Sequence, residues 1–278
     1  MINPITVGRD ELLETISCLD ILLSAQEDLG IDFFIIGAAA RDLILKHAYG
    51  QTPFRATGNV DIAVSVKDWE EYHRIINYFE SVHGMTKIPD VLRVKKDLIS
   101  IDILPFGEIA NEVGQLIYPG GSTVWSVIGF EEVNEATVTI LVSGKDEIKV
   151  ASLPGVVILK MIAWSENPHN RPQDPIDICM VMMAYHDIVG NELFTSHVDL
   201  IDDTFEFRTT GSRILGRHMA DLLGKSEWKN VVLSLLQKAL ESDPSDLVVK
   251  MGNQCQEDYS VRLACLRALL MGFEEMTH

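Results

Sequence analysis

Two short apolar runs in this chain each hold one aspartate where a core residue is expected. The first run covers residues 59–64 (NVDIAV), and the second covers residues 99–104 (ISIDIL). Their length and β-branched content predict two buried β-strands. Burying an uncompensated carboxylate is costly, so each aspartate needs a cation or hydrogen-bond donors beside it. The chain must therefore form a sheet that accommodates two acids.

The spacing of the polar residues predicts where their side chains point. Residues two apart in a strand share a face, so Asn59 and Asp61 point the same way. If the second strand lies beside the first, Asp102 joins them in a cluster of oxygen ligands. Such a cluster suits a hard divalent cation, Mg²⁺ or Mn²⁺. In the alternative, Asp61 and Asp102 face solvent or cap turns, and Asn59 is an ordinary turn residue.

A glycine turn precedes these strands. Residues 33–36 (FFII) predict a short buried strand that ends at Gly37, and a helix begins in the small residues that follow. Backbone N–H groups at such a turn, with the field of the helix N-terminus, favour a phosphate. Gly37, Ala38 and Arg41 are therefore predicted to bind phosphate. In the alternative, this is only a tight turn and Arg41 is a surface residue that pairs with Asp42.

The predicted secondary structure changes near residue 150, from mixed strands and helices to helices. Predicted strands cover residues 33–36, 60–66, 98–104, 136–142 and 148–150. Predicted helices before that point cover residues 10–29, 38–48 and 69–79, the last with Asp68 as its N-cap. Beyond Pro154, helix is favoured over 156–164, 174–185, 214–223, 228–240 and 259–273. We expect an α+β protein with a mixed sheet flanked by helices over 1–150 and an α-helical C-terminal domain over 151–278.

Charge and composition narrow the classes of protein. The chain has 23 Lys and Arg residues and 41 Asp and Glu residues, which gives a net charge of −18. This charge argues against a protein that binds the nucleic-acid backbone over its whole surface. The longest apolar run, about eight residues over 33–40, is too short to cross a bilayer. The charged N-terminal segment does not read as a signal peptide. The four cysteines lack metal-ligand spacing and are expected to be reduced thiols. We expect a soluble, cytoplasmic protein.

Several motifs together resemble a known family. Residues 34–44 (FIIGAAARDLI), 55–64 (RATGNVDIAV) and 102–107 (DILPFG) are similar to the nucleotidyltransferase superfamily that includes DNA polymerase beta. More narrowly, they resemble bacterial nucleotidyltransferases of the AbiEii/AbiGii toxin type. The resemblance continues through residues 159–164 (LKMIAW), 171–177 (RPQDPID) and 215–217 (LGR), so it spans residues 30–225.

The resemblance implies an activity and its site. Residues 1–150 would form the nucleotidyltransferase-like α/β domain. Asn59, Asp61 and Asp102 would be the catalytic and metal-binding residues for Mg²⁺ or Mn²⁺, with Asp102 accepting a proton. Lys160 and Asp174 would contact the nucleotide. The reaction transfers a nucleoside monophosphate from an NTP to an RNA acceptor such as tRNA, or to a protein side chain. A toxin–antitoxin or phage-defence role, with an antitoxin protein as partner, is also implied, and a sugar or aminoglycoside acceptor is a third alternative.

Three departures from the family pattern remove charge or ligand strength. Asn59 replaces the first acid of the family's DxD strand. Gln173 replaces a basic residue usual just before Asp174, and Asn167 replaces a basic residue expected shortly after Trp164. Asn59 is either natural or an introduced inactivating change. These departures leave open a catalytically impaired protein with this fold that binds a nucleotide or a protein partner.

The helical motifs also allow structural explanations. Lys160 lies among apolar residues. In the alternative to phosphate binding, its aliphatic stem only runs along the surface of a half-buried helix. Asp174 and Asp177, three residues apart, are in that alternative only acids of a first helical turn.

Overall fold

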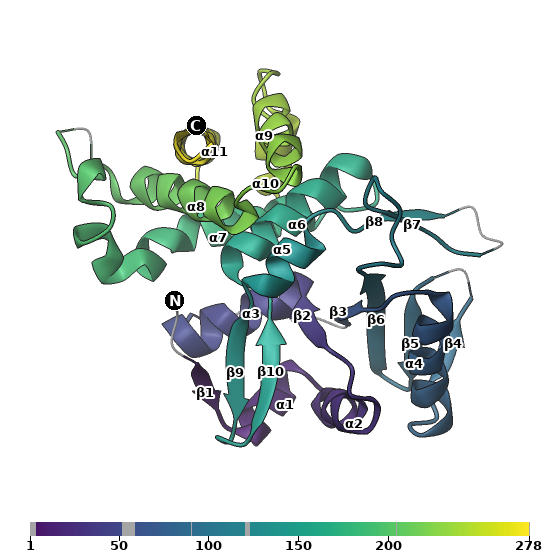
Figure 1. The fold of residues 1–278 in the computed structure, drawn as a ribbon. Helices are drawn as coiled ribbons and strands as arrows, with labels where there is room; N and C mark the ends of the chain where they lie inside the picture. The colour runs from purple at the N-terminus through teal and green to yellow at the C-terminus, as the bar shows by residue number, and fades with distance from the viewer. Residues whose placement is uncertain (1–3, 52–58, 90, 120–122, 204, 278) are drawn as a thin grey trace. The chain divides into compact units, whose positions relative to one another are not determined.

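The computed structural model describes residues 4–51, 59–89, 91–119, 123–203 and 205–277. The chain divides into two compact units, residues 1–152 and 153–278. Figure 1 traces both units from the N-terminus to the C-terminus. Each unit is described by itself below.

The first unit is built on a mixed sheet. Its strands follow the order β1-β9-β10-β2-β3-β6-β5-β4, and a separate hairpin is formed by β7 and β8. The pair β3–β6 is parallel, whereas β2 runs antiparallel to β3. The strands are β1 (Ile5–Val7), β2 (Phe33–Ile36), β3 (Val60–Ser65), β4 (Thr86–Ile88), β5 (Arg93–Lys96), β6 (Ile99–Phe106), β7 (Gln115–Ile117), β8 (Val124–Ser126), β9 (Val138–Val142) and β10 (Asp146–Val150).

The helices of this unit follow from local sequence signals. Asp68 caps α4 by accepting a hydrogen bond from the Glu71 backbone nitrogen at 2.8 Å, as the sequence predicts. The predicted helix over 10–29 is instead two helices, because the backbone leaves the helical conformation at Ile16, where φ is −126° and ψ is 86°. The helices are α1 (Arg9–Thr15), α2 (Leu19–Leu29), α3 (Gly37–Tyr49), α4 (Trp69–Ser81) and α5 (Phe130–Glu135).

The core of this unit lies around the central strands. All four residues of β2 are buried, and so are Ile62, Ala63 and Val64 of β3. A strand buried on both faces reads as a continuous apolar run, which is why these segments lack simple alternation. The two aspartates interrupt this core at β3 and β6, where they are half-buried.

The second unit is helical, and glycines bring two of its helices together. A Cβ on Gly216 of α8 would lie 2.0 Å from the Leu269 oxygen of α11, and one on Gly272 would lie 1.8 Å from the Arg213 oxygen. No other residue allows this approach. The helices are α6 (Leu153–Glu166), α7 (Asp174–Val189), the 3₁₀ turns η1 (Gly190–Phe194) and η2 (Val198–Leu200), α8 (Phe207–Leu223), α9 (Trp228–Lys238), α10 (Asp246–Met251) and α11 (Tyr259–Glu275).

The predicted α+β class is therefore confirmed, with a mixed sheet and helices in the first unit and helices in the second. No helix within the described ranges is long and apolar enough to cross a membrane.

Candidate functional site

The two strand aspartates lie side by side. In the parallel pair β3–β6, Asp61 is the register partner of Asp102. Residues directly paired in a parallel ladder point to the same face of the sheet. On its other side Asp61 pairs with Ile36, the last residue of β2. The register therefore places two carboxylates on neighbouring strands, next to the point where β2 ends.

The turn at Gly37 is built around the Asp61 carboxylate. Gly37 has a φ of +68°, a conformation that favours glycine, and α3 begins there. A Cβ at this position would lie 2.5 Å from Asp61 Oδ2. Glycine is thus required both by the backbone conformation and by the space that the carboxylate occupies. An anionic oxygen and the first turn of a helix meet at this point.

Asn59 lies immediately before β3 and is half-buried. Residues 55–58 of the motif that includes it lie outside the described residues. Its role as a ligand stays a prediction.

Arg93 is a member of this site that sequence reasoning missed. It pairs across the antiparallel β5–β6 ladder with Asp102, and its Nη2 donates to Asp102 Oδ2 at 2.7 Å while Nε donates to Oδ1. This bidentate hydrogen bond is the main cause of a raised pKa for Arg93, which burial opposes. A signal was present in the sequence, because a two-residue turn at Asp97 and Leu98 sets a register that pairs residue 93 with residue 102.

The donor set fits a hard divalent cation. Asp61 and Asp102 are adjacent carboxylates, and such oxygens are the ligands that Mg²⁺ and Mn²⁺ prefer. Arg93 is itself a cation on one of these carboxylates, so a metal must share Asp102 with Arg93 or displace it. The site therefore combines an acidic pair, an arginine that competes for it, and a glycine turn.

Arg41 lies away from solvent. Its side chain is fully buried, and its Nε and Nη2 donate to Asp42 Oδ1 at 2.8 and 2.6 Å. Ala38 is also buried. Phosphate binding by Arg41 and Ala38 stays a prediction. Arg41 pairs with Asp42 as the alternative expects, but the surface position expected for it is wrong, because both side chains are buried.

In the second unit, Lys160 joins two acids in a buried ion triad. Its Nζ lies 2.8 Å from Asp174 Oδ1 and 2.7 Å from Asp177 Oδ2, and the three side chains are 11%, 9% and 0% exposed. Burial lowers the pKa of Lys160, but the two carboxylates outweigh it and the net pKa is raised. Lys160 is thus a charged link between α6 and α7. Nucleotide contacts by Lys160 and Asp174 stay predictions.

A further polar cluster lies where η1, η2 and α8 meet. His218 Nε2 is 3.3 Å from both Glu192 Oε1 and His197 Nε2, and the remaining edge, between His197 and Glu192, is 3.8 Å. These spacings are close to the separation of about 3.3–3.6 Å between N and O ligands of a tetrahedral zinc ion. Burial is the main cause of a lowered pKa for both histidines.

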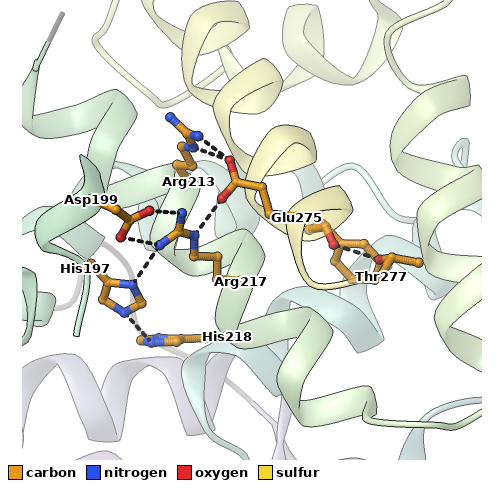
Figure 2. Close-up of polar contacts among 8 residues, drawn as sticks. His197, Asp199, Arg213, Arg217, His218, Glu275 and Thr277 are labelled. Carbon is orange, nitrogen blue, oxygen red and sulfur yellow. Dashed lines mark hydrogen bonds and ion pairs between the residues drawn. The ribbon is translucent and has the colours of Figure 1, made fainter. Parts of the chain in front are cut away.

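The neighbouring arginine argues against a metal in that cluster. Arg217 Nη1 lies 3.2 Å from His197 Nδ1, and Figure 2 shows the same guanidinium contacting Asp199 and Glu275. Arginine only donates, so Nδ1 is the acceptor and the neutral ring carries its proton on Nε2, the atom that would have to bind the metal. We interpret the cluster as a hydrogen-bonded network that fastens η1 and η2 to α8.

The chain shows similarity to known proteins at the level of solved structures. No family model matches it, and no curated protein sequence matches it. Among solved structures, it is similar to the antibiotic-resistance factor ANT(2'')-Ia in solution (13% identity, 67% of this chain and 94% of that chain, TM-score 0.36). It is also similar to an antigenic nucleotidyltransferase-like protein from Paracoccidioides brasiliensis (14%, 80% and 93%, TM-score 0.40) and to ANT(2'')-Ia in complex with adenylyl-2''-tobramycin (13%, 66% and 99%, TM-score 0.36). At these values the likeness does not assign this chain to their family.

Proposed function

We propose that this chain is a metal-dependent nucleotidyltransferase, which transfers a nucleoside monophosphate from an NTP to an acceptor and releases pyrophosphate. One observation carries the proposal: Asp61 and Asp102 are register partners on adjacent parallel strands, and the Asp61 carboxylate lies against the glycine turn that opens α3. A pair of carboxylates for a divalent cation thus adjoins a helix N-terminus suited to phosphate.

In this proposal the chain binds and orients the triphosphate. Asp61 and Asp102, with Asn59, hold Mg²⁺ or Mn²⁺, and backbone N–H groups at Gly37 and Ala38 hold the phosphates. The metal, when bound, neutralises phosphate charge and lowers the pKa of the attacking hydroxyl.

Proton transfer is assigned to Asp102. The acceptor oxygen bonds to the α-phosphorus as the bond to the pyrophosphate oxygen breaks, and the hydroxyl proton passes to an Asp102 oxygen. Hydrogen bonds from Arg93 occupy both Asp102 oxygens. Arg93 must therefore release Asp102, or share it, before Asp102 accepts the proton.

The acceptor is proposed from the resemblance of the motifs. It is an RNA such as tRNA, or a protein side chain, in a cytoplasmic toxin–antitoxin or phage-defence setting with an antitoxin as partner. A net charge of −18 restricts any RNA contact to a local basic surface.

A second candidate function rests on two observations. Asn59 stands where the family has its first acid, and Arg93 already neutralises Asp102. Both weaken the attraction of the site for a divalent cation. In this candidate the chain binds a nucleotide or a protein partner without transferring the nucleotide.

Label transfer separates the two candidates. The protein is incubated with each α-phosphate-labelled NTP, with Mg²⁺ or Mn²⁺, and with bulk tRNA. The enzyme proposal predicts labelled RNA or labelled protein, lost in Asp61→Ala and Asp102→Ala but retained in Glu70→Ala, a control at an exposed acid on α4. Absence of transfer, with activity gained in Asn59→Asp, supports the impaired protein. Absence of transfer in both proteins contradicts the enzyme proposal.

A further inference from the structure

Two cysteines far apart in sequence meet in the helical unit. Cys179 lies in α7 and Cys255 follows α10, yet their Sγ atoms are 2.6 Å apart across 76 residues of sequence. A disulfide bond is about 2.05 Å long, so a small movement of either side chain closes the bond. The sequence predicted four isolated reduced thiols, because this contact depends on how the segment after α10 packs against α7.

The segment that carries Cys255 is held in place by α11. Arg262, which is 8% exposed, donates from Nη1 to the backbone oxygens of Cys255 at 3.3 Å and of Glu257 at 2.6 Å. A Cβ on Gly252 would lie 2.6 Å from Arg262 Nη2, so the guanidinium packs directly against the chain there. This arginine therefore fixes Cys255 near Cys179 before any bond forms.

The two thiols differ in character. The Cys179 thiol donates a hydrogen bond to Cys255 Sγ, and this bond is the main cause of a lowered pKa for Cys255. The Glu257 backbone and Arg262 also lower this pKa, whereas burial opposes the shift. The same hydrogen bond and burial raise the pKa of Cys179. Cys255 is half-buried and Cys179 is buried. The pair thus combines a half-buried thiol that ionises more readily with a buried partner.

The remaining cysteines lack these features. Burial raises the pKa of Cys18 to about 12 and also raises the pKa of Cys265. Both are buried. They serve as internal controls, because thiols of this kind react slowly.

We propose that Cys179 and Cys255 form a reversible disulfide with small-molecule disulfides as the oxidant, which makes this pair a redox modification site. The inference is independent of the proposed nucleotidyl transfer.

The exchange has two balanced steps. The Cys255 thiolate attacks one sulfur of glutathione disulfide, breaks its S–S bond and releases one glutathione thiolate. Cys179 then loses its proton to solvent and attacks Cys255 Sγ, which breaks the mixed disulfide and releases the second glutathione. The protein loses two electrons and glutathione disulfide gains them. The bond closes a loop that contains α8, α9 and α10, so the oxidised unit should unfold at a higher temperature.

The test uses the full chain. It is equilibrated with glutathione buffers of increasing oxidised fraction, quenched in acid, denatured and alkylated, and then analysed by intact-mass and peptide mass spectrometry. We expect two of the four thiols to become protected, a peptide pair linked through Cys179 and Cys255, reversal by dithiothreitol, and a raised Tm.

Variants and alternative outcomes make the result decisive. Cys18→Ser should behave as the parent does, whereas Cys255→Ser should leave its three thiols open to alkylation. Three outcomes overturn the proposal: four alkylated thiols at the most oxidising ratio, a bridge between other cysteines, or a glutathione adduct on Cys255 that never closes. Each is read from the unaltered protein, so a variant that folds poorly does not affect the conclusion.

Discussion

Removing the amine of Lys160 should severely destabilise the helical unit. In Lys160→Met, two charge-assisted hydrogen bonds of 2.8 and 2.7 Å are lost, and the Asp174 and Asp177 side chains stay 9% and 0% exposed in a site built around the amine. Two such bonds at about 1.5–3 kcal/mol each give about 3–6 kcal/mol. This agrees with the cost of about 3–5 kcal/mol for breaking one partner out of a buried ion pair.

A neutral replacement of the whole triad is the matched control. Lys160→Met combined with Asp174→Asn and Asp177→Asn removes every charge, so most of the lost stability should return. The free energy of unfolding is measured by urea titration, followed by circular dichroism.

The pH dependence of the parent protein has a defined sign. The pKa of Lys160 is raised in the folded state, so the stabilisation is fully present below the ordinary value of 10.5 and is lost as the pH rises through the higher folded value.

The result also separates structure from ligand binding. If Lys160 instead binds phosphate from an open position, Lys160→Met should leave the unfolding free energy within about 0.5 kcal/mol of the parent, as at ordinary surface sites. The KM for the NTP would then rise. A stability loss below about 1 kcal/mol, roughly the cost of an exposed pair, would refute the buried triad.

Three further predictions concern the other sites. Gly37→Ala should cost about 1–2 kcal/mol of stability for the positive φ, and it should also weaken Mn²⁺ binding measured by calorimetry, because the new Cβ meets Asp61 Oδ2. The control Gly50→Ala (φ +65°, nothing within 4 Å of the Cβ) should cost stability alone. Equal Mn²⁺ affinity in both variants would contradict the geometry. Arg93→Met should strengthen Mn²⁺ binding, because it removes the cation from Asp102, and unchanged or weaker affinity would argue against competition. The pKa of His218 is lowered from 6.5, so the unfolded state takes up more protons and Tm should fall as the pH drops below that value. His218→Gln should flatten this fall, and an unaltered slope would count against the cluster as its source.

Local signals were sufficient for the central elements of the fold. The strand predicted over 33–36 is β2, and those over 60–66 and 98–104 match β3 and β6 within two residues. An apolar run bounded by turn residues needs no tertiary information to be recognised. Asp68 was equally readable, because an N-cap acts within one helical turn. The break between α1 and α2 was not, since the apolar stripe continues across it.

The candidate site was only partly readable from the sequence. Asp61 and Asp102 lie side by side because β3 and β6 are neighbouring strands. The sequence alone does not determine which strands are neighbours. The place of Arg93 depends on the register of the β5–β6 hairpin, which pairs residue 93 with residue 102. The buried triad of Lys160 required the packing of α6 on α7, which depends on side-chain fit between elements. For the same reason the cysteine pair was invisible in the spacing of the four cysteines.

The most direct test of the account is a double-mutant cycle on Mn²⁺ affinity. Calorimetry compares the parent protein with Asp61→Asn, Asp102→Asn and the combined variant. A single shared ion predicts that each single change removes most of the affinity and that the combined variant is scarcely worse than either one. Independent, additive losses, or full Mn²⁺ affinity in the combined variant, would show that these two carboxylates do not hold one metal and would contradict the proposed site.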